Sequence, residues 1–95
     1  MASFDHATPE RRAQLGRALT EAGLTWSDNG QNDPQYLTYA VTDSRNRTWQ
    51  ISPATNFQIS RSNPAQIWQA SCEKPLMTTR ALSAQVVADR IKNAP

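Results

Sequence analysis

The segment WQISPATNFQISRSNPAQIWQAS, residues 49–71, decides the fold of this 95-residue chain. One pattern occurs in it three times, at residues 49–52, 57–60 and 68–71: an aromatic residue, Gln, an aliphatic residue and Ser. Apolar residues at every second position are typical of a β-strand with one buried face and one solvated face. We therefore expect strands that bury their aromatic residues and expose their Gln and Ser residues.

Outward from this segment, four strands are predicted, joined by short turns. They span residues 36–42, 47–52, 57–61 and 66–72. Short connections favour pairing between successive strands, which gives an antiparallel meander. A further short strand at residues 24–26 is left open.

A helix is predicted on each side of the strands. Thr8 and Pro9 are typical of a helix N-cap and of the first helical position, and Gly23 is typical of a helix end, so the first helix lies between them. The second helix is predicted at residues 79–93, where apolar residues recur at helical spacing behind a capping Thr.

The predicted fold class follows from these apolar faces. Each helix has one apolar stripe and the sheet has one apolar face, so an α+β fold is expected. The N- and C-terminal helices pack on one face of a four-stranded antiparallel meander, in the order α-β-β-β-β-α. The length suits a single compact domain, residues 1–95, with loose termini. Gly16, inside the first helix, is expected to mark close packing against the sheet.

The other face of the sheet is predicted to be flat, polar and almost uncharged. It holds the strand positions that alternate with the buried ones: Thr38, Thr42, Thr48, Gln50, Ser52, Gln58, Ser60, Gln69 and Ser71, with Tyr36 and Ile67. Charged side chains usually guard sheets against association. This open polar face is therefore the first candidate for docking a partner.

No motif for catalysis or metal binding is found in the sequence. The single His and the single Cys, His6 and Cys72, lie far apart, which excludes a zinc site built from them. Strand parity places Cys72 in the core. Asp28 and Asp33 share one turn-rich polar segment and do not offer the two contrasting environments that an acid and a base require. We expect a protein that is not an enzyme and uses no cofactor or metal.

Charge suggests a second candidate site. The net charge is +2, and the basic residues are dispersed along the chain instead of forming the stripe that is typical of nucleic-acid binding. Arg45, Arg47 and Arg61 fall on turns and strand ends, where they could bind an acidic partner or a phosphate backbone. The sequence contains no apolar run that could span a membrane and no signal peptide, so we expect a cytoplasmic protein without a membrane partner.

The order of elements is similar to that of double-stranded RNA-binding domains. Those domains have three strands and a basic cluster where the second helix begins. Residues 78–82 contain one basic residue, Arg80. The family is therefore not assigned.

The function predicted from the sequence is that of a small non-catalytic protein-binding module, an inhibitor, adaptor or regulator of the kind that phages and mobile elements encode. It acts through the open polar face or the Arg-bearing rim, with these contact residues: Tyr36, Arg45, Arg47, Gln50, Gln58, Arg61 and Gln69. A nucleic-acid-binding module that uses Arg45, Arg47 and Arg61 is the alternative, and a small enzyme is a more distant one. A homodimer through the sheet face or edge is left open.

Overall fold

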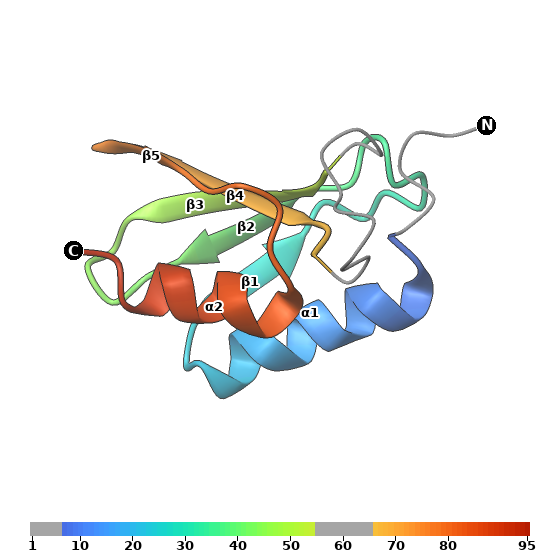
Figure 1. The fold of residues 1–95 in the computed structure, drawn as a ribbon, viewed down its shortest axis with the longest axis horizontal. Coiled ribbons are helices and arrows are strands. Elements are labelled where there is room, and N and C mark those ends of the chain that lie inside the picture. Colours follow the sequence, from blue (N-terminus) through green and yellow to red (C-terminus); the bar gives the residue numbers. More distant parts are fainter. Residues whose placement is uncertain (1–6, 55–65) are drawn as a thin grey trace.

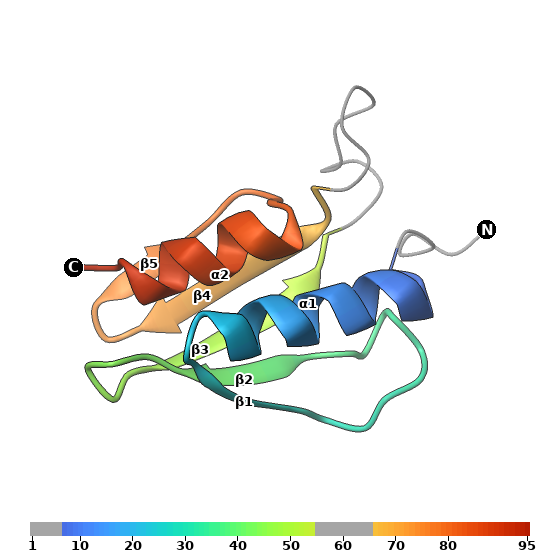
Figure 2. The ribbon, with the colours of Figure 1, turned by 90° about the horizontal axis from the view of Figure 1, so that it is seen from below.

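The computed structural model describes residues 7–54 and 66–95. These residues form two helices and five strands: α1 (Pro9–Glu21), β1 (Thr25–Asp28), β2 (Tyr39–Thr42), β3 (Thr48–Pro53), β4 (Trp68–Glu73), β5 (Leu76–Thr78) and α2 (Ala84–Lys92). The strands form one antiparallel sheet in the order β1-β2-β3-β4-β5. Both helices lie side by side on the same face of this sheet (Figures 1 and 2).

The predicted α+β class, the antiparallel sheet and the placement of both helices on one face are confirmed. The predicted number of four strands is wrong, because the described residues contain five. β1 corresponds to the strand left open at residues 24–26, and β5 was not predicted. The predicted strand at residues 57–61 lies outside the described residues. The sequence predicted that the strand at residues 47–52 pairs with one at residues 57–61. β3 instead pairs directly with β4, with Trp49 opposite Cys72, so this predicted pairing is wrong.

Alternation along the two central strands builds the core. Trp49 and Ile51 in β3 are buried, as are the three alternate residues of β4, Trp68, Ala70 and Cys72. The predicted inward face of both strands is thus confirmed. A side chain as large as Trp removes 150–250 Å² of surface from water, so the two buried Trp residues dominate the apolar burial of this sheet.

An aromatic chain extends the core toward β1. The ring centroid of Tyr39 lies 5.7 Å from that of Trp68, edge to face, and 5.7 Å from that of Trp26. Trp26 is held in place by its Nε1–H, which donates to Thr20 Oγ1 of α1 at 3.0 Å. These contacts connect both the outer strand β1 and helix α1 to the centre of the sheet.

Helix α1 confirms its predicted boundaries and the reason for its internal glycine. Thr8 Oγ1 accepts the backbone N–H of Arg11 at 3.3 Å, and Gly23 has a positive φ of 76°. A Cβ added to Gly16 would lie 2.9 Å from Cζ2 and Cη2 of Trp26, closer than side chains pack. Gly16 is therefore the position at which the Trp26 ring lies against the helix, as predicted.

Helix α2 begins later than predicted. Its N-cap is Ser83, whereas the sequence predicted a start at Thr79. The backbone before Ser83 is held by β4 instead: the Thr79 N–H donates to the Ala70 carbonyl at 2.9 Å. Trp68 and Leu82 exchange two backbone hydrogen bonds of 2.9 and 2.8 Å. Residues 79–82 fit the apolar spacing of the predicted helix, but their backbone pairs with β4, so the helix starts after them.

Replacing Trp49 by Ala is expected to lower the free energy of unfolding by about 3–5 kcal/mol, because the surrounding core cannot collapse fully into the space left. The total stability of such a domain is roughly 5–15 kcal/mol, so this variant is close to unfolded. Urea denaturation followed by circular dichroism measures the loss. Gln50→Ala, one residue along on the exposed face, is the matched control, with an expected change of about 0.5 kcal/mol or less. Equal losses for both variants would contradict the assigned faces.

Candidate functional site

The open face of the sheet carries a continuous row of uncharged residues that crosses all five strands. Strand register aligns its members, one per strand from β1 to β5: Ser27, Ala40, Gln50, Ser71 and Thr78. Both helices lie on the opposite face, so no described helix covers the row (Figure 1). In β2, β3 and β4, buried core residues precede and follow the member of the row, so the core fixes the backbone of the row there.

The neighbouring rows are mostly uncharged. Thr25, Thr42 and Thr48 are aligned on one side of the central row, where β4 and β5 add the exposed pair Glu73 and Leu76. Ser52 and Gln69 are aligned on the other side. Gln50 is exposed, whereas Ser52, Gln69 and Ser71 are half-buried among their neighbours. The face therefore presents hydroxyl and amide groups at strand spacing, with Gln50 as its most accessible long side chain.

Two residues predicted for this face occupy other positions. Tyr36 is 60% exposed but lies in the turn before β2, which begins at Tyr39 and not at residue 36. Asn29 Nδ2 donates to the Tyr36 carbonyl at 2.8 Å, which fixes that turn. Ile67 is fully buried, so its predicted place on the open face is wrong. It precedes β4, and its carbonyl accepts the Ala54 N–H at 2.7 Å in the core.

Three further predicted positions, Gln58, Ser60 and Arg61, lie outside the described residues. The structure therefore brings together Gln50 and Gln69 on the open face, and it places Tyr36 and Arg45 as exposed residues at the periphery. Cys72 is buried in β4, in agreement with its predicted parity.

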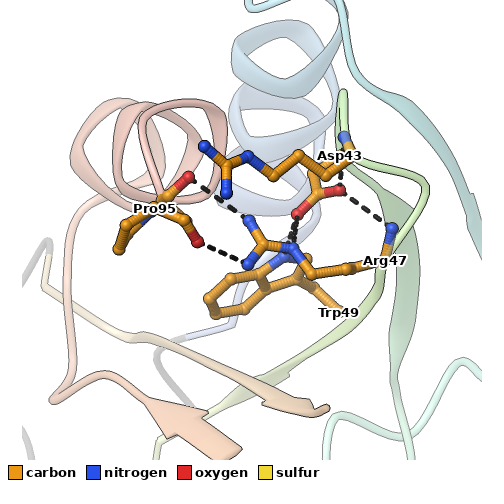
Figure 3. Close-up of polar contacts among 6 residues, drawn as sticks. Asp43, Arg47, Trp49 and Pro95 are labelled. Carbon is orange, nitrogen blue, oxygen red and sulfur yellow. Dashed lines mark hydrogen bonds and ion pairs between the residues drawn. The ribbon is translucent and has the colours of Figure 1, made fainter. Parts of the chain in front are cut away.

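Arg47, the central residue of the predicted Arg-bearing rim, is used inside the molecule. Its Nε donates to Asp43 Oδ2 at 2.8 Å, and its Nη1 and Nη2 donate to the carbonyls of Pro95 and Ala94 at 2.6 and 3.3 Å (Figure 3). The side chain is only 14% exposed. Its guanidinium connects the β2–β3 turn to the segment after α2 and has little capacity left for an external phosphate.

Asp43 is the acceptor around which this corner is organised. Its carboxylate accepts the Trp49 indole N–H at 2.9 Å and the backbone N–H groups of Arg45 and Arg47, both at 2.9 Å. Asn46 completes the turn with a positive φ of 66°, as the three-residue hairpin connection requires. The two rim arginines that the structure describes thus differ: Arg45 contributes a backbone group and Arg47 its whole guanidinium.

The pKa of Asp43 reflects these contacts. Burial raises the pKa of its carboxyl, but the hydrogen bonds from Trp49, Arg47 and Arg45 outweigh burial and lower it to about 2. Sequence reasoning missed this residue. Trp49 was the available signal, because a core Trp requires an acceptor for its indole N–H. Asp43 lies across the β2–β3 turn from Trp49, six residues before it in the chain.

Within the described residues, no three His, Cys, Asp or Glu side chains gather in a way that could hold a metal ion. None of the helices that the structure describes has the length and the apolar character that a membrane crossing requires. Comparison of the chain with protein-family models, with curated proteins and with solved structures found no match. Function is therefore inferred from the geometry of the open face and its surroundings.

Replacing Arg47 by Met is expected to lower the free energy of unfolding by about 3–5 kcal/mol, because it leaves the Asp43 charge buried without its partner. Arg45→Met, two residues away and exposed, is the matched control, with an expected change of about 0.5 kcal/mol or less. Urea denaturation at neutral pH measures both. The sequence predicted instead that Arg47 belongs to a freely accessible rim. Equally small losses of stability in both variants would support that prediction and contradict the buried ion pair.

Acid is expected to destabilise the protein partly through Asp43. Its folded pKa of about 2 lies below the ordinary value of 3.8, so its contribution is present above pH 4 and is lost as the pH falls toward 2. Between pH 5 and pH 2.5 the wild type should lose about 1–2 kcal/mol more stability than Asp43→Asn, which has no carboxyl to titrate. Denaturant titrations at both pH values give the comparison. Asp33→Asn, an exposed site, should behave like the wild type, and parallel losses in all three proteins would rule out this role of Asp43.

Proposed function

We propose that this protein is a small non-catalytic protein-binding module, an inhibitor, adaptor or regulator, and that the open face of its sheet is the docking surface. The observation that supports this most directly is the uncharged row from Ser27 to Thr78, which crosses five strands and has no described helix over it.

The rigidity of this face favours a preformed recognition surface. Gln50 and Ser71 are opposite each other in the register, and each has buried neighbours on both sides along its strand, among them Trp49 and Cys72. A partner therefore meets side chains whose backbone is already fixed by the core. Binding then costs less conformational entropy than it would on a loop.

The chemistry of the face favours protein over nucleic acid. Hydroxyl and amide groups both donate and accept hydrogen bonds, which suits the mixed donors and acceptors of a protein surface. A phosphate backbone is bound mainly by Lys and Arg, and neither occurs among the five members of the central row. The alternative, a nucleic-acid-binding module, would need Arg47 to contact phosphate. Its guanidinium is bonded to Asp43, Ala94 and Pro95, which argues against that role.

The size of the face indicates that the periphery takes part. Five strands at about 4.8 Å spacing, with about 3.3 Å of rise per residue, give a flat area of roughly 20 Å by 15 Å. One partner of a standard interface contributes roughly 800 Å². We therefore propose that exposed peripheral side chains such as Tyr36 and Arg45 extend the contact beyond the strands.

The test is a site-specific photo-crosslink followed by an affinity measurement. Benzoylphenylalanine is placed at Gln50 on the open face and, as the matched control, at exposed Gln14 on α1. After irradiation in extracts of the native host, the proposal expects a protein adduct from position 50 and none from position 14. The adduct is identified by mass spectrometry, and the partner is then purified.

With that partner, Ser71→Arg is expected to weaken binding at least tenfold, because it places a long charged side chain in the middle of the row. Gln14→Arg carries the same charge on α1 and should bind like the wild type. Calorimetry at low and moderate salt should give similar affinities for the wild type, since few charges are neutralised. An adduct from position 14 alone, or unchanged affinity of Ser71→Arg, would move the docking surface to the helices.

A further inference from the structure

The strand β5 leaves one of its edges unpaired by any described strand. The Thr79 N–H donates to the Ala70 carbonyl, and hydrogen-bonded and non-hydrogen-bonded pairs alternate along an antiparallel ladder. Met77 therefore directs its backbone groups toward β4, whereas Leu76 and Thr78 direct theirs outward. The N–H and C=O of Thr78, in particular, are available to another strand.

This edge is apolar on both sides. Leu76 is 78% and Val86 41% exposed, and they are two of the three large apolar side chains that the described residues expose. Between β5 and α2 lies a hollow of about 430 Å³, lined by Met77, Val86 and Trp49 among others. No residue of β5 carries a charge, whereas the opposite edge strand β1 ends with Asp28. β5 itself therefore carries no charged guard, and the nearest charged residues, Glu73 and Lys74 before it and Arg80 after it, lie beyond its ends.

We infer that the β5 edge binds a second copy of this chain. The two β5 strands pair antiparallel around a two-fold axis at Thr78, and the two sheets join into one. This interface uses the sheet edge and α2, so it goes beyond the proposed partner surface on the open face and does not depend on it.

The backbone geometry suits such a symmetric pair. Two copies of Thr78 on the axis exchange both of their outward hydrogen bonds, N–H to C=O in each direction. On the helix side, Met77 of one copy lies opposite Thr79 of the other. On the open side, Leu76 of one copy lies opposite Arg80 of the other, whose aliphatic stem covers it. The exposed apolar side chains of both copies are then removed from water.

The charges of α2 are self-complementary about the same axis. The residues of α2 that line the hollow are Val86, Asp89, Arg90 and Asn93, whose midpoint falls between Asp89 and Arg90. α2 runs alongside β4 (Figure 2), starting near Trp68, which pairs with Leu82. From Trp68 to the level of Thr78, opposite Ser71, is about 10 Å of strand, equal to the rise of six to seven residues of helix, which from Ala84 reaches Arg90.

Arg90, with Asp89 beside it, therefore lies at about the level of the axis. A two-fold rotation makes the two α2 helices antiparallel, so Asp89 of each copy faces Arg90 of the other. A self-complementary patch of this kind is what an isologous dimer interface requires. This match of charge, together with the apolar edge, favours a second copy over an unrelated strand.

The test is sedimentation equilibrium of the full chain from micromolar to near-millimolar concentration. The wild type is expected to show a monomer–dimer equilibrium. Asp89→Arg should raise the dimer dissociation constant at least tenfold, because it sets two arginines opposite each other. The double variant Asp89→Arg/Arg90→Asp should restore dimerisation, since the opposite charges again face each other. Glu21→Arg on α1, with the same change in charge, is the control and should dimerise like the wild type.

A second variant tests the backbone pairing. Thr78→Pro removes the N–H that both axial hydrogen bonds use, and it leaves the β4 ladder intact because that N–H points outward. It should abolish the dimer while retaining the circular dichroism spectrum of the wild type. A wild type that stays monomeric throughout, or a dimer that neither Asp89→Arg nor Thr78→Pro weakens, would overturn the inference. In the first case the β5 edge is left for a strand of another protein.

Discussion

The hydrogen bond from the Trp49 indole to the Asp43 carboxylate is the contact on which the arrangement of the structure depends. A core Trp buries a large apolar ring and one N–H that requires an acceptor. Asp43 supplies the acceptor, at 2.9 Å, and Arg47 balances its charge at 2.8 Å. The same guanidinium binds the carbonyls of Ala94 and Pro95, so the central hairpin and the segment after α2 are held at one corner.

The two faces of the sheet differ in character. On the helix side the sheet is filled by Trp49, Trp68 and their apolar neighbours, and Gly16 of α1 lets Trp26 approach closely. On the other side the same strands present a level array of hydroxyl and amide groups. Arg47, which the sequence places among the surface charges, is bonded within the molecule, whereas the uncharged strand positions lie on the face that no described helix covers. This difference supports our proposal that a partner binds to the polar face.

Much of this division could be predicted from the sequence, because side-chain direction in a strand has a strict period of two. The inward positions Trp49, Ile51 and Trp68 follow from it, and the first helix follows from Thr8, Pro9 and Gly23. Period alone could not give the partners of each strand. β5 has three residues and no alternation long enough to recognise, so its pairing with β4 and the late start of α2 at Ser83 were missed. Ile67 was misplaced because the strand parity was extended beyond the start of β4. The Asp43 corner depends on contacts between separate elements, which spacing does not reveal.

NMR with a soluble gadolinium chelate distinguishes the buried face of the sheet from the open one. The chelate broadens signals of groups that it can approach. We expect strong broadening of the Gln50 side-chain amide and little effect on the Trp49 indole N–H, although the two residues are adjacent in β3. A protected Gln50 amide together with a broadened Trp49 indole would contradict this arrangement, because it would exchange the buried and open faces of the sheet.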